Sequence, residues 1–91
     1  MKLKWTSKAQ GDLARLHAFL AKANPTAASR LVRSLVAAST RLLAAPRIGE
    51  RLDEFHPREV RRIIVAHYEV RYEIQAETLF VLRIWHAREN R

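Results

Sequence analysis

The chain has 91 residues, enough for one small domain, and it contains no cysteine, which excludes disulfides, thiolate metal ligands and a cysteine nucleophile. Its composition, 48% apolar and 29% charged with two glycines and three prolines, is typical of a folded chain rich in regular structure. No apolar run approaches the roughly 18 residues of a membrane span, and no hydrophobic segment follows the first four residues as it does in a signal peptide. We therefore expect a cytoplasmic protein.

The formal net charge of +8 belongs to the first half of the chain. Residues 1–49 hold nine basic residues and one acidic residue, whereas residues 50–91 hold eight of each. An electrostatic field with this excess of positive charge favours an anionic partner, such as nucleic acid, the ribosome or an acidic protein segment. A solvated basic surface that keeps a small domain soluble explains the same excess.

The first half predicts a short strand followed by two helices. Residues 2–5 alternate like a strand, and Thr6 and Ser7 can cap a helix over residues 7–23. Asn24 and Pro25 then start a second helix over residues 25–45, and the short link makes the two helices an antiparallel hairpin. Apolar residues line one face of each helix at helical spacing, and basic residues line the other: Lys8, Arg15 and Lys22 on the first, Arg30, Arg33 and Arg41 on the second.

The second half predicts a loop and then a sheet. Pro46 ends the second helix, and residues 47–57 have the composition of a loop. Residues 59–87 change to a period of two and predict a three-stranded meander, with Leu82 and Ile84 on one face of the last strand and Arg83 and Trp85 on the other. The order β-α-α-β-β-β predicts a single α+β domain over residues 1–91, in which the helical hairpin packs on a mainly antiparallel sheet.

The sequence contains no glycine-rich phosphate loop, no catalytic triad pattern and no metal-ligand spacing, so we expect no cofactor and no metal. His86 is the one candidate for chemistry, because Arg83 precedes it and Arg88 follows it. An imidazole beside guanidinium groups could act as a general base on a ribose hydroxyl. Alternatively, His86 ends the strand and hydrogen-bonds the backbone. Glu69 and Glu73 share one strand face with Arg71, and cross-strand ion pairs explain them without an enzyme.

Five segments, in order over nearly the whole chain, resemble the ParE/RelE family of bacterial type II toxins: KWTSKAQGDL, ANPTAASRLV, LLAAPRIGERL, PREVRRIIVAHYEVRYEI and VLRIWHAREN. The resemblance implies a small cytoplasmic toxin of the β-α-α-β-β-β fold, bound in a heterodimer or heterotetramer by an antitoxin from the same operon. Such antitoxins wrap an extended or helical segment over the helices and sheet of the toxin. On this chain, the residues implied for antitoxin binding are Leu13, Leu16, Leu20, Arg30, Arg33 and Arg41.

The family divides by target, because RelE-type members cleave mRNA on the ribosome and ParE-type members poison DNA gyrase. By resemblance, Glu69 stands where the nucleases carry an arginine, and Ala87 stands where they carry a late tyrosine. A glutamate there would repel a developing phosphorane. The ending LRIWHARENR resembles the ParE type, which predicts a non-enzymatic gyrase poison that binds its target through Arg83, His86 and Arg88.

Two alternatives remain open at the level of sequence. One is a ribosome-dependent mRNA endoribonuclease with His86 as base and Arg62 or Arg83 near the phosphate. The other is an inactive family member that is retained as a partner in DNA autoregulation or as a structural subunit. Expression without harm to the cell would indicate this last interpretation.

Overall fold

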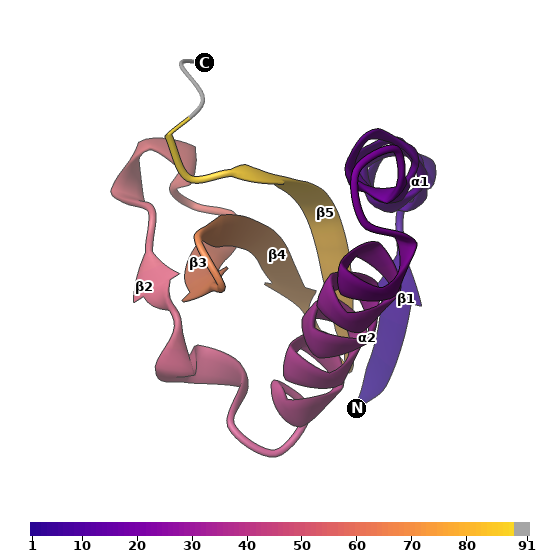
Figure 1. The fold of residues 1–91 in the computed structure, drawn as a ribbon. Coiled ribbons are helices and arrows are strands. Elements are labelled where there is room, and N and C mark those ends of the chain that lie inside the picture. The colour runs from indigo at the N-terminus through magenta and orange to yellow at the C-terminus, as the bar shows by residue number, and fades with distance from the viewer. Residues whose placement is uncertain (89–91) are drawn as a thin grey trace.

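The computed structural model describes residues 1–88. The elements are, in chain order, β1 (Lys2–Trp5), α1 (Ser7–Ala21), α2 (Pro25–Arg41), β2 (Glu50–Arg51), β3 (Glu59–Val65), β4 (Tyr68–Gln75) and β5 (Thr78–His86). The strands form one sheet in the order β1-β5-β4-β3-β2, with β1 parallel to β5 and the other neighbours antiparallel. Both helices lie beside β1 and β5, and β2 lies at the opposite edge (Figure 1). The predicted α+β class and element order are confirmed, with β2 as an addition.

Both helices begin at the caps that the sequence indicates. The side chain of Thr6 accepts a hydrogen bond from the backbone of Ala9, and that of Asn24 accepts one from the backbone of Ala27. The helices end at Ala21 and Arg41, earlier than the predicted ends at residues 23 and 45. Residues 42–45 bond to carbonyl oxygens three residues back, so the chain tightens into turns before the proline. No helix among residues 1–88 is long and apolar enough to cross a membrane.

The segment predicted as a loop over residues 47–57 is more regular than its composition suggests. It contains β2 and a short 3-10 turn at Asp53–Phe55. The Tyr72 hydroxyl fixes the start of this segment, because it donates to the carbonyl oxygen of Pro46 at 2.7 Å and accepts from the N–H of Gly49 at 3.0 Å. A Cβ atom at Gly49 would lie 2.5 Å from that hydroxyl oxygen, so this close approach requires glycine.

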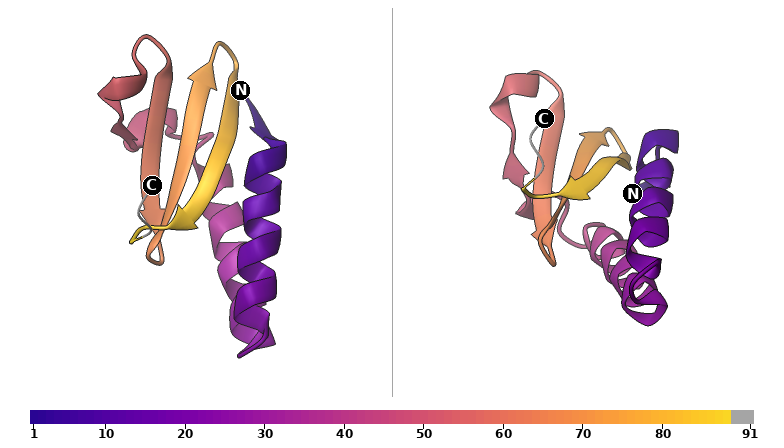
Figure 2. Two further views of the ribbon diagram at one scale, coloured as in Figure 1. Left: turned by 90° about the horizontal axis from the view of Figure 1, so that it is seen from above. Right: turned by 45° about the horizontal axis from the view of Figure 1, so that its top comes forward.

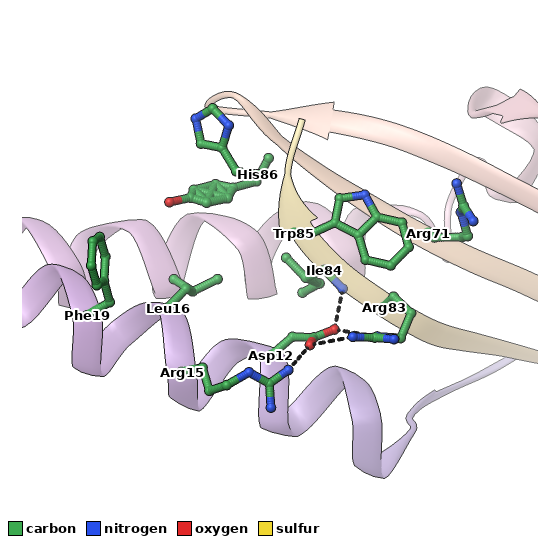
Figure 3. Close-up of a pocket in the computed structure, with 10 residues that line it drawn as sticks. Asp12, Arg15, Leu16, Phe19, Arg71, Arg83, Ile84, Trp85 and His86 are labelled. Carbon is green, nitrogen blue, oxygen red and sulfur yellow. Dashed lines mark hydrogen bonds and ion pairs between the residues drawn. The ribbon is translucent and has the colours of Figure 1, made fainter. Parts of the chain in front are cut away.

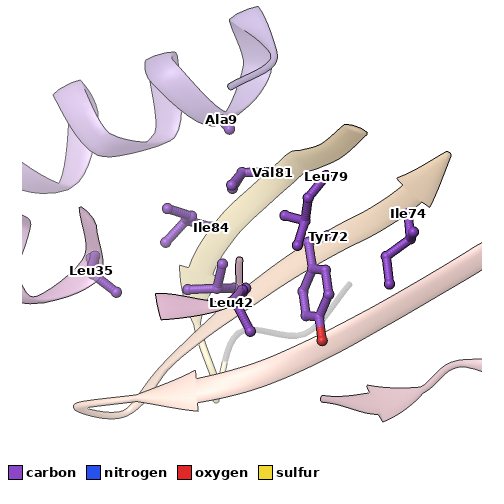
Figure 4. Packing of buried hydrophobic residues seen from close by; sticks show 9 residues of the cluster. Ala9, Leu35, Leu42, Tyr72, Ile74, Leu79, Val81 and Ile84 are labelled. Carbon is purple, nitrogen blue, oxygen red and sulfur yellow. The ribbon is translucent and has the colours of Figure 1, made fainter. Parts of the chain in front are cut away.

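The helical hairpin covers one face of the sheet, as predicted. The two helices lie side by side along the sheet (Figure 2). Figure 4 shows the side chains that meet between the layers. The buried cluster consists of Ala9, Leu35, Leu42, Val70, Tyr72, Ile74, Leu79, Val81 and Ile84. Leu13 and Leu16 of the predicted antitoxin set pack against this cluster and are half-buried.

A β-bulge changes the facing of β5. Arg71 pairs with Arg83 but the next residue, Tyr72, pairs with Val81, which leaves Leu82 as the extra residue. Val81 and Ile84 are therefore both buried although they are three residues apart. The prediction that Leu82 shares a face with Ile84 is wrong. Leu82 instead lines a surface pocket together with Arg83 and Trp85. Strict alternation along the sequence cannot reveal an inserted residue.

Candidate target-binding site

Side chains at and near the start of α1 hydrogen-bond the backbone of β5 beyond the point where β1 ends. β1 pairs with β5 as far as Val81. Just beyond, the Thr6 hydroxyl lies 3.0 Å from the carbonyl oxygens of Val81 and Leu82, to which it donates. The N–H of Ile84 then donates to Oδ2 of Asp12 at 2.8 Å. Two side chains at the start of the helix thus replace the missing strand partner.

Asp12 is the centre of an ion-pair network between α1 and β5. Its side chain accepts from Nε of Arg83 at 2.9 Å and from Nη2 of Arg83 at 3.1 Å, and Arg15 contacts the same carboxylate from one turn further along the helix (Figure 3). Burial alone would raise the pKa of Asp12. The hydrogen bonds from Arg83 and Ile84 and the charges of both arginines outweigh burial, so the pKa lies below its ordinary value. Asp12 is therefore a carboxylate at neutral pH.

A recess of about 720 Å³ opens beside this network, between α1 and the end of β5. Figure 3 shows Leu16 and Phe19 of α1 on the side of the recess opposite His86. Phe19 is 71% exposed, an unusual environment for a large aromatic side chain. Leu16 was predicted for the antitoxin, whereas Arg83 and His86 were predicted for the target. The structure brings all three residues to one recess.

His86 is held at the end of β5 by local contacts. Its ring meets Tyr68 edge to face, with 5.2 Å between ring centroids and an interplanar angle of 78°. Its Nδ1 accepts a hydrogen bond from the N–H of Arg88 at 3.1 Å, and the N–H of Ala87 donates to the carbonyl oxygen of His67 at 2.8 Å. These contacts match the interpretation of His86 as a strand-ending residue that bonds the backbone.

Arginine and aromatic side chains pack against one another in the part of the recess lined by Arg71, Arg83 and Trp85. The guanidinium of Arg71 lies 4.8 Å from the ring centroid of Trp85 and 5.4 Å from that of Phe55, and the guanidinium of Arg83 lies 5.3 Å from Trp85. Such cation–π contacts contribute roughly 0.5–2 kcal/mol each. They hold Trp85 and the end of β5 in place.

Buried carboxylates neutralise the arginines of this sheet face. Glu69, 1% exposed, pairs with Arg71 at 2.9 Å and with Arg62 at 3.3 Å. Glu73 accepts two hydrogen bonds from Arg58, at 3.0 and 2.8 Å. These bonds lower the pKa of Glu73 although its burial would raise it. The cross-strand pairing expected for Glu69 is present.

The other predicted residues lie away from the recess. Arg62 pairs with Glu50 of β2 as well as with Glu69. Arg88 is exposed just after β5, and Leu20 of α1 is half-buried. Three further predicted residues are exposed on α2: Arg30, Arg33 and Arg41.

Sequence reasoning missed Asp12, Phe19 and Tyr68. A signal for Asp12 was present, because it lies three residues after Ala9 and four before Leu16, on the buried stripe of the helix. A carboxylate on such a stripe requires a cationic partner. The periodicity of α1 cannot name that partner, because Arg83 lies 71 residues away in sequence.

Comparison with known proteins identifies the family. The sequence matches the family described as the ParE toxin of the type II toxin-antitoxin system parDE, over residues 3–91. The chain belongs to the ParE toxin family. It is also similar to a solved structure of the chromosomal ParDE toxin-antitoxin system from P. aeruginosa, with 24% identity, a TM-score of 0.77, and coverage of 94% of this chain and 95% of that chain. That similarity shows the fold. No curated protein matches the sequence.

Proposed function

We propose that this ParE-family toxin is a non-enzymatic poison of DNA gyrase, which traps gyrase on cleaved DNA and is neutralised by a cognate antitoxin. Membership of the ParE toxin family supports a toxin of a type II system. The gyrase target rests on the resemblance of the C-terminal strand to ParE toxins and on the electrostatics of the site. Because gyrase acts on chromosomal DNA, the proposed site of action is the cytoplasm.

The observation that carries the proposal is that carboxylates neutralise Arg71 and Arg83, which line the recess with His86, and Arg62, the other arginine named for a nuclease. Within residues 1–88, Arg83 pairs with Asp12, and Arg71 pairs with Glu69. Arg62 pairs with Glu69 and Glu50. A nuclease stabilises the charge of a phosphorane with preorganised cations. Here the guanidinium groups of Arg62, Arg71 and Arg83 would first have to leave a carboxylate, which disfavours the endoribonuclease and favours a binding surface.

The proposed target-binding surface is the end of β5 and the residues that follow it. Its members are Arg83, His86 and Arg88. The Arg83 side chain is 38% exposed, so it can contact a partner at the rim while Asp12 fixes its orientation. Arg88 is exposed and is oriented by its backbone hydrogen bond to His86. Residues 89–91, which the resemblance to ParE toxins also includes, lie outside the described part of the chain.

The antitoxin is proposed to cover the helices and the recess. The similar P. aeruginosa structure is of a ParDE toxin-antitoxin system. An amphipathic acidic segment would suit the exposed Phe19 and its neighbour Leu16, as in helix-in-groove recognition. The net charge of +8 would accelerate encounter with such a segment. A heterodimer or a heterotetramer is expected.

A chain that ends at Ala87 tests the division between the target and antitoxin surfaces. We expect this truncation to bind the antitoxin about as tightly as the full chain does, because α1, α2 and every residue that lines the recess are retained, although the hydrogen bond from Arg88 to His86 is lost. Its inhibition of gyrase supercoiling should fall about tenfold or more, as expected when charged contacts worth about 1.4 kcal/mol or more are lost. Loss of antitoxin binding, or full inhibition of gyrase by the truncated chain, would contradict the proposed surfaces.

A further inference from the structure

The arginines of the sheet and those of α2 differ in whether they are paired with carboxylates. On the sheet side, arginines are paired with carboxylates: Arg47 and Arg61 with Glu59, Arg51 with Asp53, Arg58 with Glu73, Arg62 with Glu50 and Glu69, and Arg71 with Glu69. In contrast, α2 contains no acidic residue, and the carboxylate of α1, Asp12, is buried. The exposed charges of the helical hairpin are therefore all positive.

One exposed face of α2 carries three of these cations. Arg30, Arg33 and Arg41 fall within an arc of about 80° at 100° per residue, and none of them forms an ion pair within residues 1–88. We call this face the α2 arginine face. The exposed residues within or beside the arc are small or carry a hydroxyl: Thr26, Ser34, Ala37 and Thr40.

The chemistry of the α2 arginine face fits phosphate groups better than a protein surface. The core of a protein interface is apolar and aromatic, and the nearest large apolar side chain, Val36, lies outside the arc and is 38% exposed. Contacts to nucleic-acid backbones are made by arginine together with serine and threonine hydroxyls. The 17 residues of α2 extend over about 25 Å, a length over which duplex DNA presents many phosphates.

We propose that the α2 arginine face binds the phosphate backbone of duplex DNA without sequence preference. The choice of DNA over other polyanions rests on the proposed function, which places the toxin on gyrase while gyrase holds DNA. A toxin that binds DNA as well as gyrase would bind the gyrase–DNA complex more tightly, because the second contact adds avidity. An acidic antitoxin segment laid over α2 would compete with DNA for the same three arginines.

The test is the fluorescence anisotropy of a labelled 20-base-pair duplex with the purified full chain, between 50 and 200 mM NaCl. Each phosphate contact contributes about 0.9 to the slope of log K against log salt. The variant R30Q/R33Q/R41Q should therefore reduce that slope by about 2–3 and weaken binding at 100 mM NaCl by roughly tenfold or more. Glutamine is a good helix former, so α2 should persist, and circular dichroism checks that it does.

The matched control is K2Q/K4Q/R51Q, which removes the same number of positive charges from exposed positions on β1 and β2. Equal loss of DNA binding in both variants would overturn the proposal in favour of bulk charge. Unchanged DNA binding in R30Q/R33Q/R41Q would overturn the proposal. If that variant kept DNA binding but lost antitoxin binding, the face would be a protein-docking face. A parent chain that binds DNA through these arginines but leaves gyrase supercoiling untouched would support the DNA contact while contradicting the gyrase target.

Discussion

Individual side chains in this protein fix segments whose sequence carries little structural signal. The Tyr72 hydroxyl bonds both Pro46 and Gly49 and so organises the chain between the second helix and β3. The alternation of β4 places Tyr72 on the core side, and the structure agrees. It could not show that the hydroxyl reaches a segment 23 to 26 residues earlier in the chain.

Gly49→Ala should destabilise the fold by about 1–3 kcal/mol, because the added methyl group would collide with the Tyr72 hydroxyl and with the backbone oxygen of Arg62 at 2.7 Å. Gly11→Ala is the control within the same chain. Its methyl group would meet only the flexible end of Arg15, and alanine favours a helix over glycine by about 0.5–1 kcal/mol, so this variant should be slightly stabilised. Urea unfolding measures both free energies, and equal midpoints for the two variants would refute the steric argument.

At the scale of elements, the periodicity of apolar residues predicted the helices and strands, because one face of each is buried. The caps at Thr6 and Asn24 and the β-rich segment after residue 59 gave the order of helices and strands correctly. The bulge at Leu82 escaped prediction because it depends on how β5 pairs with β4. The Asp12–Arg83 pair escaped it for a similar reason, because each residue alone reads as an ordinary surface charge.

Asp12→Asn should lower the free energy of unfolding at pH 7 by about 1–3 kcal/mol, because it removes a charged acceptor from Arg83 and Ile84. The folded-state pKa of Asp12 is depressed, so its stabilisation is complete above its unfolded value near 3.8 and is lost as the pH falls through the folded value. The variant should therefore lose less stability than the parent on acidification below about pH 4.

Urea midpoints at pH 7, 5 and 3 measure the acid dependence of Asp12→Asn. Glu73 also has a lowered pKa, so some acid sensitivity should persist in the variant. Arg15→Gln is the control, since the exposed Arg15 side chain should contribute less than about 1 kcal/mol. Identical pH profiles for the parent and Asp12→Asn would mean that this carboxylate is not linked to folding.

At the scale of the whole molecule, the sheet and the helical hairpin differ in how their charges are paired, and the proposed division of roles rests on this difference. From β2 to β5, carboxylates such as Glu69 and Glu73 are buried against arginines, whereas the exposed charges of the hairpin are all positive. The sequence showed the excess charge of residues 1–49 and predicted ion pairs for Glu69 and Glu73. It could not show that Arg62 and Arg58 are their partners or that both carboxylates are buried. In the proposed function, that pairing is the reason to favour a binding surface over a phosphate-cleaving site.

The measurement that tests the gyrase target most directly compares two activities of one purified preparation freed of antitoxin. We predict that the chain inhibits supercoiling by DNA gyrase, that linear DNA accumulates from trapped cleavage complexes, and that mRNA on ribosomes stays intact. The prediction would be contradicted if the chain cleaved mRNA, left gyrase unaffected, and lost this cleavage activity in the variant His86→Ala. That result would mean that His86 and its ion-paired arginines suffice for catalysis.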